Sequence, residues 1–231
     1  MTHFAMEKHF PLEQSGHRST ALLNLSAGDK LPMAIVDDKG VDNKGVDNKG
    51  IGNDKILRNT DRKSNAIELL VIEGCCEDDN QIYSQGYYLR LPDGPAVSLT
   101  AKTDCILFIK YNQFLDGDDG SRAIDTRIAN QWLPGPVDGI EIIPLHVYDT
   151  ESIMLLRWHH AAEFRPKLNP RGEEILVVNG LLQNRDNLYR QFSWIRNPIE
   201  DWRKWHGNTG TLAYYKSGHF PDDPIRYDQA P

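Results

Sequence analysis

The sequence predicts an all-β protein built from two similar units. Three observations lead to this prediction: short apolar runs that end at glycine, polar turns between them at regular intervals, and a gapless internal repeat. Short strands separated by turn signals at such spacing are typical of a β-sandwich or barrel. No long amphipathic helical pattern interrupts them.

Each copy of the repeat contains an apolar run rich in Val, Ile and Leu, which favours a buried strand. The first run covers Ile67 to Ile72, its counterpart covers Ile175 to Val178, and a glycine follows each. A polar turn and an aromatic strand come next, and proline ends that strand in both units because it has no N–H for the ladder. We expect the closing strands at 105–111 and 211–216.

The internal repeat aligns Glu68–Gly74 with Glu174–Gly180, a separation of 106 residues, and continues without a gap as far as Phe114 and Phe220. Its identical pairs include Tyr83 and Tyr189, Gln85 and Gln191, Arg90 and Arg196, Pro92 and Pro198, and Lys110 and Lys216. So many coincidences in a gapless alignment indicate duplication of one unit. We therefore expect an N-terminal unit at 1–114, a linker at 115–130 and a C-terminal unit at 131–231.

Upstream of the repeat, Leu22-Leu23 aligns with Leu155-Leu156 at a separation of 133, so the first copy carries 27 additional residues. They include tandem VDNKG-type units in a low-complexity segment, 36–55. This polar, Gly-rich composition cannot bury a core, and we expect a mobile, dispensable loop. A calcium loop is the alternative because aspartates recur, but the D-x-[DN]-x-[DN]-G spacing and the distal glutamate are absent. The aspartates at 116, 118 and 119 also lack that glutamate.

Composition excludes several classes of protein. A net charge of −7 argues against a nucleic-acid or anionic-membrane surface, since phosphates attract an excess of Lys and Arg. No apolar stretch approaches the length of a membrane span, and the first residues lack a secretion signal, so we expect a cytoplasmic protein. Cys75, Cys76 and Cys105 have no metal-site or disulfide spacing, which favours reduced thiols.

Residues 172–180, Gly-Glu-Glu-Ile-Leu-Val-Val-Asn-Gly, resemble the G-E-E-x-L-V-L-x-G block of cupins. The wider context is similar to the cupin-like domain of the ChrR anti-sigma factors; it includes Trp132-Leu133-Pro134-Gly135, Leu155-Leu156-Arg157, Tyr189 and Trp194-Ile195-Arg196-Asn197-Pro198. The resemblance covers about 130–220 directly and 19–114 through the repeat. It implies two cupin-type double-stranded β-helix (jelly-roll) barrels, that is, a bicupin.

Members of this family usually hold zinc, iron or manganese on a His-x-His pair, a following Glu and a later His. In this chain the His-x-His positions fall on Lys167 and Asn169, and the later His falls on Arg203. The carboxylate is present as Glu173 or Glu174, whereas in the first copy the resemblance keeps only the equivalent Glu68. Because cations repel a divalent ion, the resemblance predicts a lost metal site and no cofactor.

Two interpretations of these positions stay open. Lys167, Arg203 and Glu174 could form an internal ion-pair cluster, or they could line a pocket for a small anion that Arg203 binds in a bidentate manner. The candidate pocket residues are Glu174, Arg203, Lys167, Asn169, Arg196 and Trp194.

A metal site rebuilt from other ligands is the alternative. Its candidates are Glu174, His159, His160 and His206, although His159 and His160 are adjacent and would face opposite sides of a strand. The remaining histidines are expected on the surface: His3, His9, His17, His146 and His219.

The sequence therefore favours a non-catalytic ChrR-like cupin protein that binds a small anionic molecule or a protein partner, or forms a homodimer. Sigma-factor inhibition is not expected, since the zinc-binding helical domain of ChrR has no counterpart in the sequence. The alternatives are a metal-dependent cupin enzyme of the dioxygenase or isomerase type, and a purely structural or dimerising module.

Overall fold

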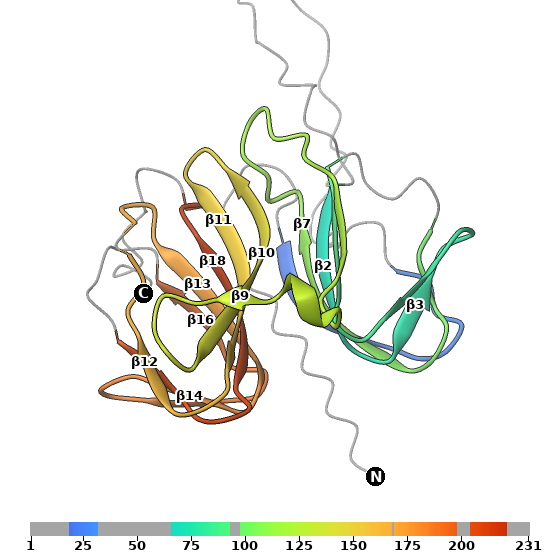
Figure 1. Ribbon diagram of the computed structural model, residues 1–231. Helices are drawn as coiled ribbons and strands as arrows, with labels where there is room; N and C mark the ends of the chain where they lie inside the picture. The colour runs from blue at the N-terminus through green and yellow to red at the C-terminus, as the bar shows by residue number, and fades with distance from the viewer. Residues whose placement is uncertain (1–18, 32–65, 93–97, 168, 198–203, 221–231) are drawn as a thin grey trace, which may run out of the picture.

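A computed structural model describes residues 19–31, 66–92, 98–167, 169–197 and 204–220 (Figure 1). The described chain is made of β-strands with one short 3-10 helix, η1 (Ala129–Gln131), so the all-β prediction is confirmed. Segment 36–55, predicted to be a loop, and the candidate Arg203 lie outside the described residues. No helix among the described residues has the length and apolar character needed to cross a membrane.

The N-terminal unit consists of two sheets that enclose an apolar core. The larger sheet has the order β1 (Ser19–Leu25), β7 (Cys105–Tyr111), β2 (Ile67–Glu73), β5 (Tyr87–Leu91) and β8 (Arg122–Asp125). The smaller sheet has the order β4 (Ile82–Ser84), β3 (Cys75–Glu77) and β6 (Thr100–Ala101). The core between them includes Leu69, Leu89, Leu107 and Tyr111, and all three cysteines of the unit are free thiols, as expected.

The C-terminal unit repeats this plan. Its larger sheet has the order β16 (Trp194–Asn197), β13 (Glu173–Asn179), β18 (Leu212–Ser217), β11 (Glu151–Trp158), β10 (Ile140–Tyr148) and β9 (Leu133–Pro134). Its smaller sheet has the order β12 (Ala162–Phe164), β17 (Trp205–Gly207), β14 (Leu181–Gln183) and β15 (Leu188–Arg190). A second apolar core lies between these two sheets.

A third apolar cluster joins the units. It contains Leu70 and Phe108 from the N-terminal unit and Leu176 and Tyr214 from the C-terminal unit, so the two larger sheets pack face to face. The molecule therefore has four β-layers, with the two larger sheets in the middle (Figure 1). The described strands form open sheets and not the closed barrels that were expected.

The alternation of side chains along each central strand explains this layering. On β2, Ile67, Leu69 and Val71 belong to the core of their own unit, whereas Leu70 and Ile72 belong to the cluster between the units. Successive side chains of a strand point to opposite faces, so a strand buried on both faces reads as one continuous apolar run. This is the run that the sequence marks at the start of each copy of the gapless repeat.

The ladders of the two units have matching registers. Glu68 lies opposite Lys110 in the β2–β7 pair, and Glu174 lies opposite Lys216 in the β13–β18 pair. Both ladders also shift register at matching places, between Val71 and Glu73 and between Val177 and Asn179. Residues that the sequence repeat aligns therefore occupy corresponding positions in the two larger sheets.

The segment predicted as a linker, 115–130, contributes to the first unit. Within it, β8 pairs with β5, and Asp118 is buried at 7 % exposure. The chain thus completes the N-terminal sheet before it enters the C-terminal unit at β9.

Candidate functional site

The interior of the C-terminal unit, where the family resemblance would place a metal, is filled with apolar side chains. Its buried members include Trp158, Phe164, Trp205 and Tyr215. Glu173 points toward the same interior, because it alternates along β13 with Ile175 and Val177 of this core. The Tyr215 hydroxyl donates a hydrogen bond to Glu173 Oε2 at 3.0 Å. This carboxylate is thus already engaged by a neighbouring side chain.

Trp158 fits this interior because a glycine lies beneath its ring. A Cβ atom placed on Gly207 would lie 2.5 Å from the Trp158 ring, well inside van der Waals contact. In the N-terminal unit, the smaller Leu25 occupies the position aligned with Trp158, and Ala101 occupies the position aligned with Gly207. The two interiors are therefore filled by different combinations of a large and a small residue.

We expect Gly207→Ala to lower the free energy of unfolding by about 1–3 kcal/mol, the usual cost of overpacking a filled core. Urea unfolding of the variant measures this loss. The double variant with Trp158→Leu should recover part of it, because it reproduces the Leu–Ala combination of the other unit. A Gly207→Ala protein as stable as the wild type would show that the interior contains spare volume.

Of the residues expected to replace the metal ligands, the two that the structure describes, Lys167 and Asn169, form no ion pair or hydrogen bond with Glu174. Lys167 is exposed, and no ion pair joins it to Glu174. The Asn169 amide is used locally, since it donates to the Thr150 carbonyl at 3.2 Å and accepts from the Arg171 N–H at 3.0 Å. Their predicted arrangement with Arg203 cannot be placed, because Arg203 lies outside the described residues.

The pocket candidates Trp194 and Arg196 lie near the N-terminal unit: Trp194 on the face that meets it, and Arg196 beside Trp194 at the border of that face. Arg196 lies between two aromatic rings. Its guanidinium carbon is 5.6 Å from the centroid of the Trp194 ring and 4.9 Å from that of the Phe220 ring. Trp194 also packs edge-on against Phe108 of the N-terminal unit. These contacts give both side chains a packing role at the junction.

The three histidines of the alternative metal site bind different carboxylates. His159 pairs with Glu141, His160 with Asp138 and His206 with Glu163, and each imidazole is more than half exposed. Glu174, in contrast, is 1 % exposed and lies between the units. The described structure does not bring these four candidates together.

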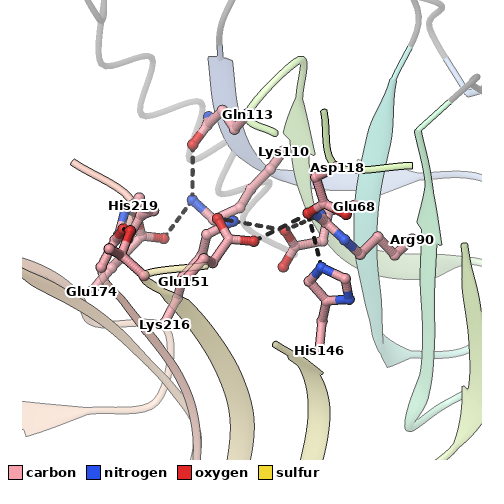
Figure 2. A network of polar contacts seen from close by, with 12 residues as sticks. Glu68, Arg90, Lys110, Gln113, Asp118, His146, Glu151, Glu174, Lys216 and His219 are labelled. Carbon is pink, nitrogen blue, oxygen red and sulfur yellow. Dashed lines mark hydrogen bonds and ion pairs between the residues drawn. The ribbon is translucent and has the colours of Figure 1, made fainter. Parts of the chain in front are cut away.

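Charged side chains gather instead in the layer between the two larger sheets, which we call the junction layer (Figure 2). Two reciprocal ion pairs cross it. Lys110 Nζ of the N-terminal unit lies 2.6 Å from Glu174 Oε1, and Lys216 Nζ of the C-terminal unit lies 2.9 Å from Glu68 Oε2. All four side chains are almost completely buried. Each unit thus provides the counterion for the other.

One end of the junction layer is built around Glu174. His219 Nε2 lies 3.2 Å from Glu174 Oε2, and Lys110 Nζ donates hydrogen bonds to Thr20 Oγ1 and Gln113 Oε1. Burial alone would raise the pKa of Glu174, but Lys110 and His219 hold it well below its usual range. Burial lowers the pKa of His219 to about 4 despite the adjacent carboxylate. At neutral pH this end pairs one carboxylate with one ammonium beside a neutral imidazole.

The other end is built around Arg90. Its guanidinium forms an ion pair with Asp118 and lies 3.3 Å from Glu151 Oε1 and 3.5 Å from Glu68 Oε2. Burial would raise the pKa of Glu68, but Lys216 and Arg90 lower it to about 2. His146 Nε2 completes this end, 2.8 Å from Asp118 Oδ2.

Both buried histidines were expected on the surface, and that prediction is wrong. His146 is 4 % exposed and the His219 side chain 7 %. Burial and Arg90 lower the pKa of His146, which keeps its imidazole neutral at pH 7. Asp118 stays ionised because Arg90 and His146 outweigh the effect of burial on its pKa.

The C-terminal part of the chain is similar to a known family. Residues 121–221 match the family model of the ChrR Cupin-like domain. This confirms the resemblance predicted from the sequence for the C-terminal unit. A search of curated proteins finds no match to the chain.

Solved structures share the fold at low sequence identity. A putative dioxygenase from Nostoc punctiforme matches with a TM-score of 0.62 and 13 % identity, over 97 % of this chain and 77 % of that chain. A putative glyoxylate-induced protein from Pseudomonas aeruginosa matches with a TM-score of 0.54 and 11 % identity, over 100 % and 80 %. A cupin 2 conserved barrel domain protein from Leptotrichia buccalis matches with a TM-score of 0.52 and 10 % identity, over 94 % and 91 %. Together they show that the chain has a cupin fold.

The resemblance to the ChrR cupin-like domain did not predict most of the residues of the junction layer. One signal was available: Glu174 and Lys216 interrupt apolar strands, and the repeat aligns them with Glu68 and Lys110. A charge that recurs inside a strand buried on both faces needs a buried counterion. His146 and Glu151 lie outside the gapless repeat, and no pattern in the sequence marks them.

Proposed function

We propose that this chain is a non-catalytic cupin-fold protein, which works by binding a small anionic ligand or a protein partner, and that its C-terminal unit has lost the metal site typical of its family. The observation that carries the proposal is the apolar filling around Glu173. Trp158, Phe164 and Trp205 pack into this interior, and Tyr215 engages the carboxylate.

The ligand set supports the same proposal. Catalytic metals in proteins are held by three or more protein ligands with an open position for substrate or water. At the family positions this chain has Lys167, Asn169 and Arg203, none of which is an imidazole or a carboxylate. Glu173 is a suitable ligand, but alone it does not supply the number of ligands required.

The alternative of a metal-dependent cupin enzyme with rebuilt ligands has less support. Its candidate histidines are exposed and bind separate carboxylates, while Glu174 is committed to Lys110 and His219. The solved structures that resemble this chain include a putative dioxygenase, but at 13 % identity that similarity extends to the fold alone.

We also propose that the two units are copies of one cupin unit. Three observations support it: the matching registers of the ladders, the reciprocal ion pairs across the junction layer, and the paired replacement of Leu25 and Ala101 by Trp158 and Gly207. A crystal structure in which the two larger sheets fail to superpose would contradict this proposal.

Elemental analysis of the purified full chain tests the loss of the family metal site. Glu173→Gln removes the family carboxylate while keeping its size and its capacity to accept from Tyr215. We expect wild type and variant to contain the same amount of zinc, iron and manganese. A metal present in the wild type and absent from Glu173→Gln would show that the interior of the C-terminal unit holds it after all.

A further inference from the structure

We infer that Asp118, His146 and Glu151 form a site for a divalent transition-metal ion in the junction layer, outside the interiors of both units. One ligand atom from each residue lies within 4.8 Å of the others, and all three residues are buried. They come from three separate parts of the chain: the segment between β7 and β8, strand β10 and strand β11. Figure 2 shows their side chains converging beside Arg90.

The chemistry of the three side chains fits such an ion. An imidazole nitrogen and two carboxylates form a mixed nitrogen and oxygen set, which suits zinc, iron and manganese. His146 offers its Nε2 atom toward Asp118. Magnesium and calcium, which prefer oxygen ligands alone, suit it less.

The balance of charge in the junction layer points to a missing cation. Its four buried carboxylates are Glu68, Asp118, Glu151 and Glu174, and its three buried cations are Arg90, Lys110 and Lys216. At their formal charges, these buried groups leave one negative charge; Arg196, at the border of the layer, is only partly buried and is not counted. A buried charge without a counterion is costly, so the surplus attracts a cation.

The surplus lies at the Arg90 end. At the other end, Lys110 forms the ion pair with Glu174. The remaining buried cations, Arg90 and Lys216, form ion pairs with three carboxylates: Glu68, Asp118 and Glu151. Three carboxylates therefore share two cations next to His146. This is the place where an additional positive charge would be stabilised most.

Unused polar atoms give a further, independent indication. Neither carboxylate oxygen of Glu151 accepts a hydrogen bond from any described residue, although Arg90 and Lys216 lie 3.3 and 3.1 Å away. Glu151 is 0 % exposed, so it has no access to bulk water. Buried carboxylates normally accept several hydrogen bonds, and a metal ion would use these lone pairs.

Arg90 competes with the ion, and this sets the expected affinity. Its guanidinium bridges Asp118 and Glu151, so it must give up these contacts when an ion binds. It keeps two other partners, Glu68 at 3.5 Å and the Phe114 ring at 3.9 Å. We therefore expect moderate affinity, with the ion removable by a chelator.

Titration of the chelator-treated full chain with Zn²⁺ tests the site. We expect one equivalent to bind to the wild type, and His146→Gln to weaken binding by about tenfold or more. His159→Gln is the matched control, since this histidine is exposed and pairs with Glu141; it should bind like the wild type. No binding by the wild type, or equal binding by the two variants, would overturn the inference.

A second readout covers the case in which His146→Gln does not fold. Co²⁺ added to the wild type should give the visible absorption of a nitrogen-coordinated ion, and Zn²⁺ should raise the melting temperature reversibly. A melting temperature that Zn²⁺ leaves unchanged would also overturn the inference. Failure here is distinct from failure of the proposed function, because a metal lost in Glu173→Gln but kept in His146→Gln would place the ion inside the C-terminal unit.

Discussion

Replacing Lys110 by methionine should lower the free energy of unfolding by about 3–5 kcal/mol, the usual cost of leaving one member of a buried ion pair without its partner. Lys110 and Glu174 are each 1 % exposed, and their charged atoms are 2.6 Å apart. Without the ammonium, Glu174 keeps the neutral His219 as its neighbouring donor among the described residues. Urea unfolding followed by tryptophan fluorescence measures the loss.

Two further variants separate the ion pair from simple packing. The double variant Lys110→Met, Glu174→Leu should recover most of the stability, because a buried ion pair can be replaced by apolar side chains at little cost. Lys102→Met removes an exposed ion pair with Glu77 and should change stability little, because solvent screens such pairs. If Lys110→Met cost as little as Lys102→Met, Glu174 would have to find another counterion or accept water.

Acid should destabilise the protein between pH 6.5 and about 4 through His219, whose pKa burial lowers to about 4 in the folded state. The unfolded chain, with the ordinary pKa of 6.5, takes up the proton first as the pH falls. The contribution of His219 to stability is therefore complete above pH 6.5 and is lost as the pH falls toward 4. A difference of this size corresponds to about 3 kcal/mol.

The free energy of unfolding, measured by urea titration at a series of pH values, checks this prediction. His219→Gln cannot take up a proton, so its stability should change less than that of the wild type between pH 6.5 and 4. His160→Gln, at an exposed histidine, should follow the wild-type profile. Below this range Glu68, whose pKa is about 2, should add a second loss of stability between pH 4.5 and 2. Parallel profiles for His219→Gln and the wild type would contradict the role of His219.

The fold was predictable because it depends on patterns that the chain displays locally. Apolar runs marked β2 and β13. Residues that the repeat aligns lie in matching registers, with Glu68 opposite Lys110 and Glu174 opposite Lys216. The packing of sheet on sheet was not predictable in the same way. An apolar run shows that a strand is buried on both faces, but it does not tell which face meets its own unit and which meets the other.

That ambiguity explains the errors at the candidate site. Glu173 and Glu174 are adjacent in the family block, and they point to opposite faces of β13. Glu174 lies in the junction layer, so its partners among the described residues are Lys110 and His219 and not Lys167 or Asn169. His146 was assigned to the surface because a single histidine on a strand carries no sign of the buried carboxylate it meets, which here comes from a different part of the chain.

The reciprocal ion pairs give the junction the property of an isologous interface, in which residue i contacts residue j and j in turn contacts i. Such a face is complementary to a copy of itself. Because both faces belong to one chain, each meets its partner at an effective concentration on the order of millimolar, set by the short connection between the units. The contacts of the junction therefore need only modest intrinsic affinity to keep the two units together, which leaves room for buried charges that a freely associating dimer could tolerate less easily.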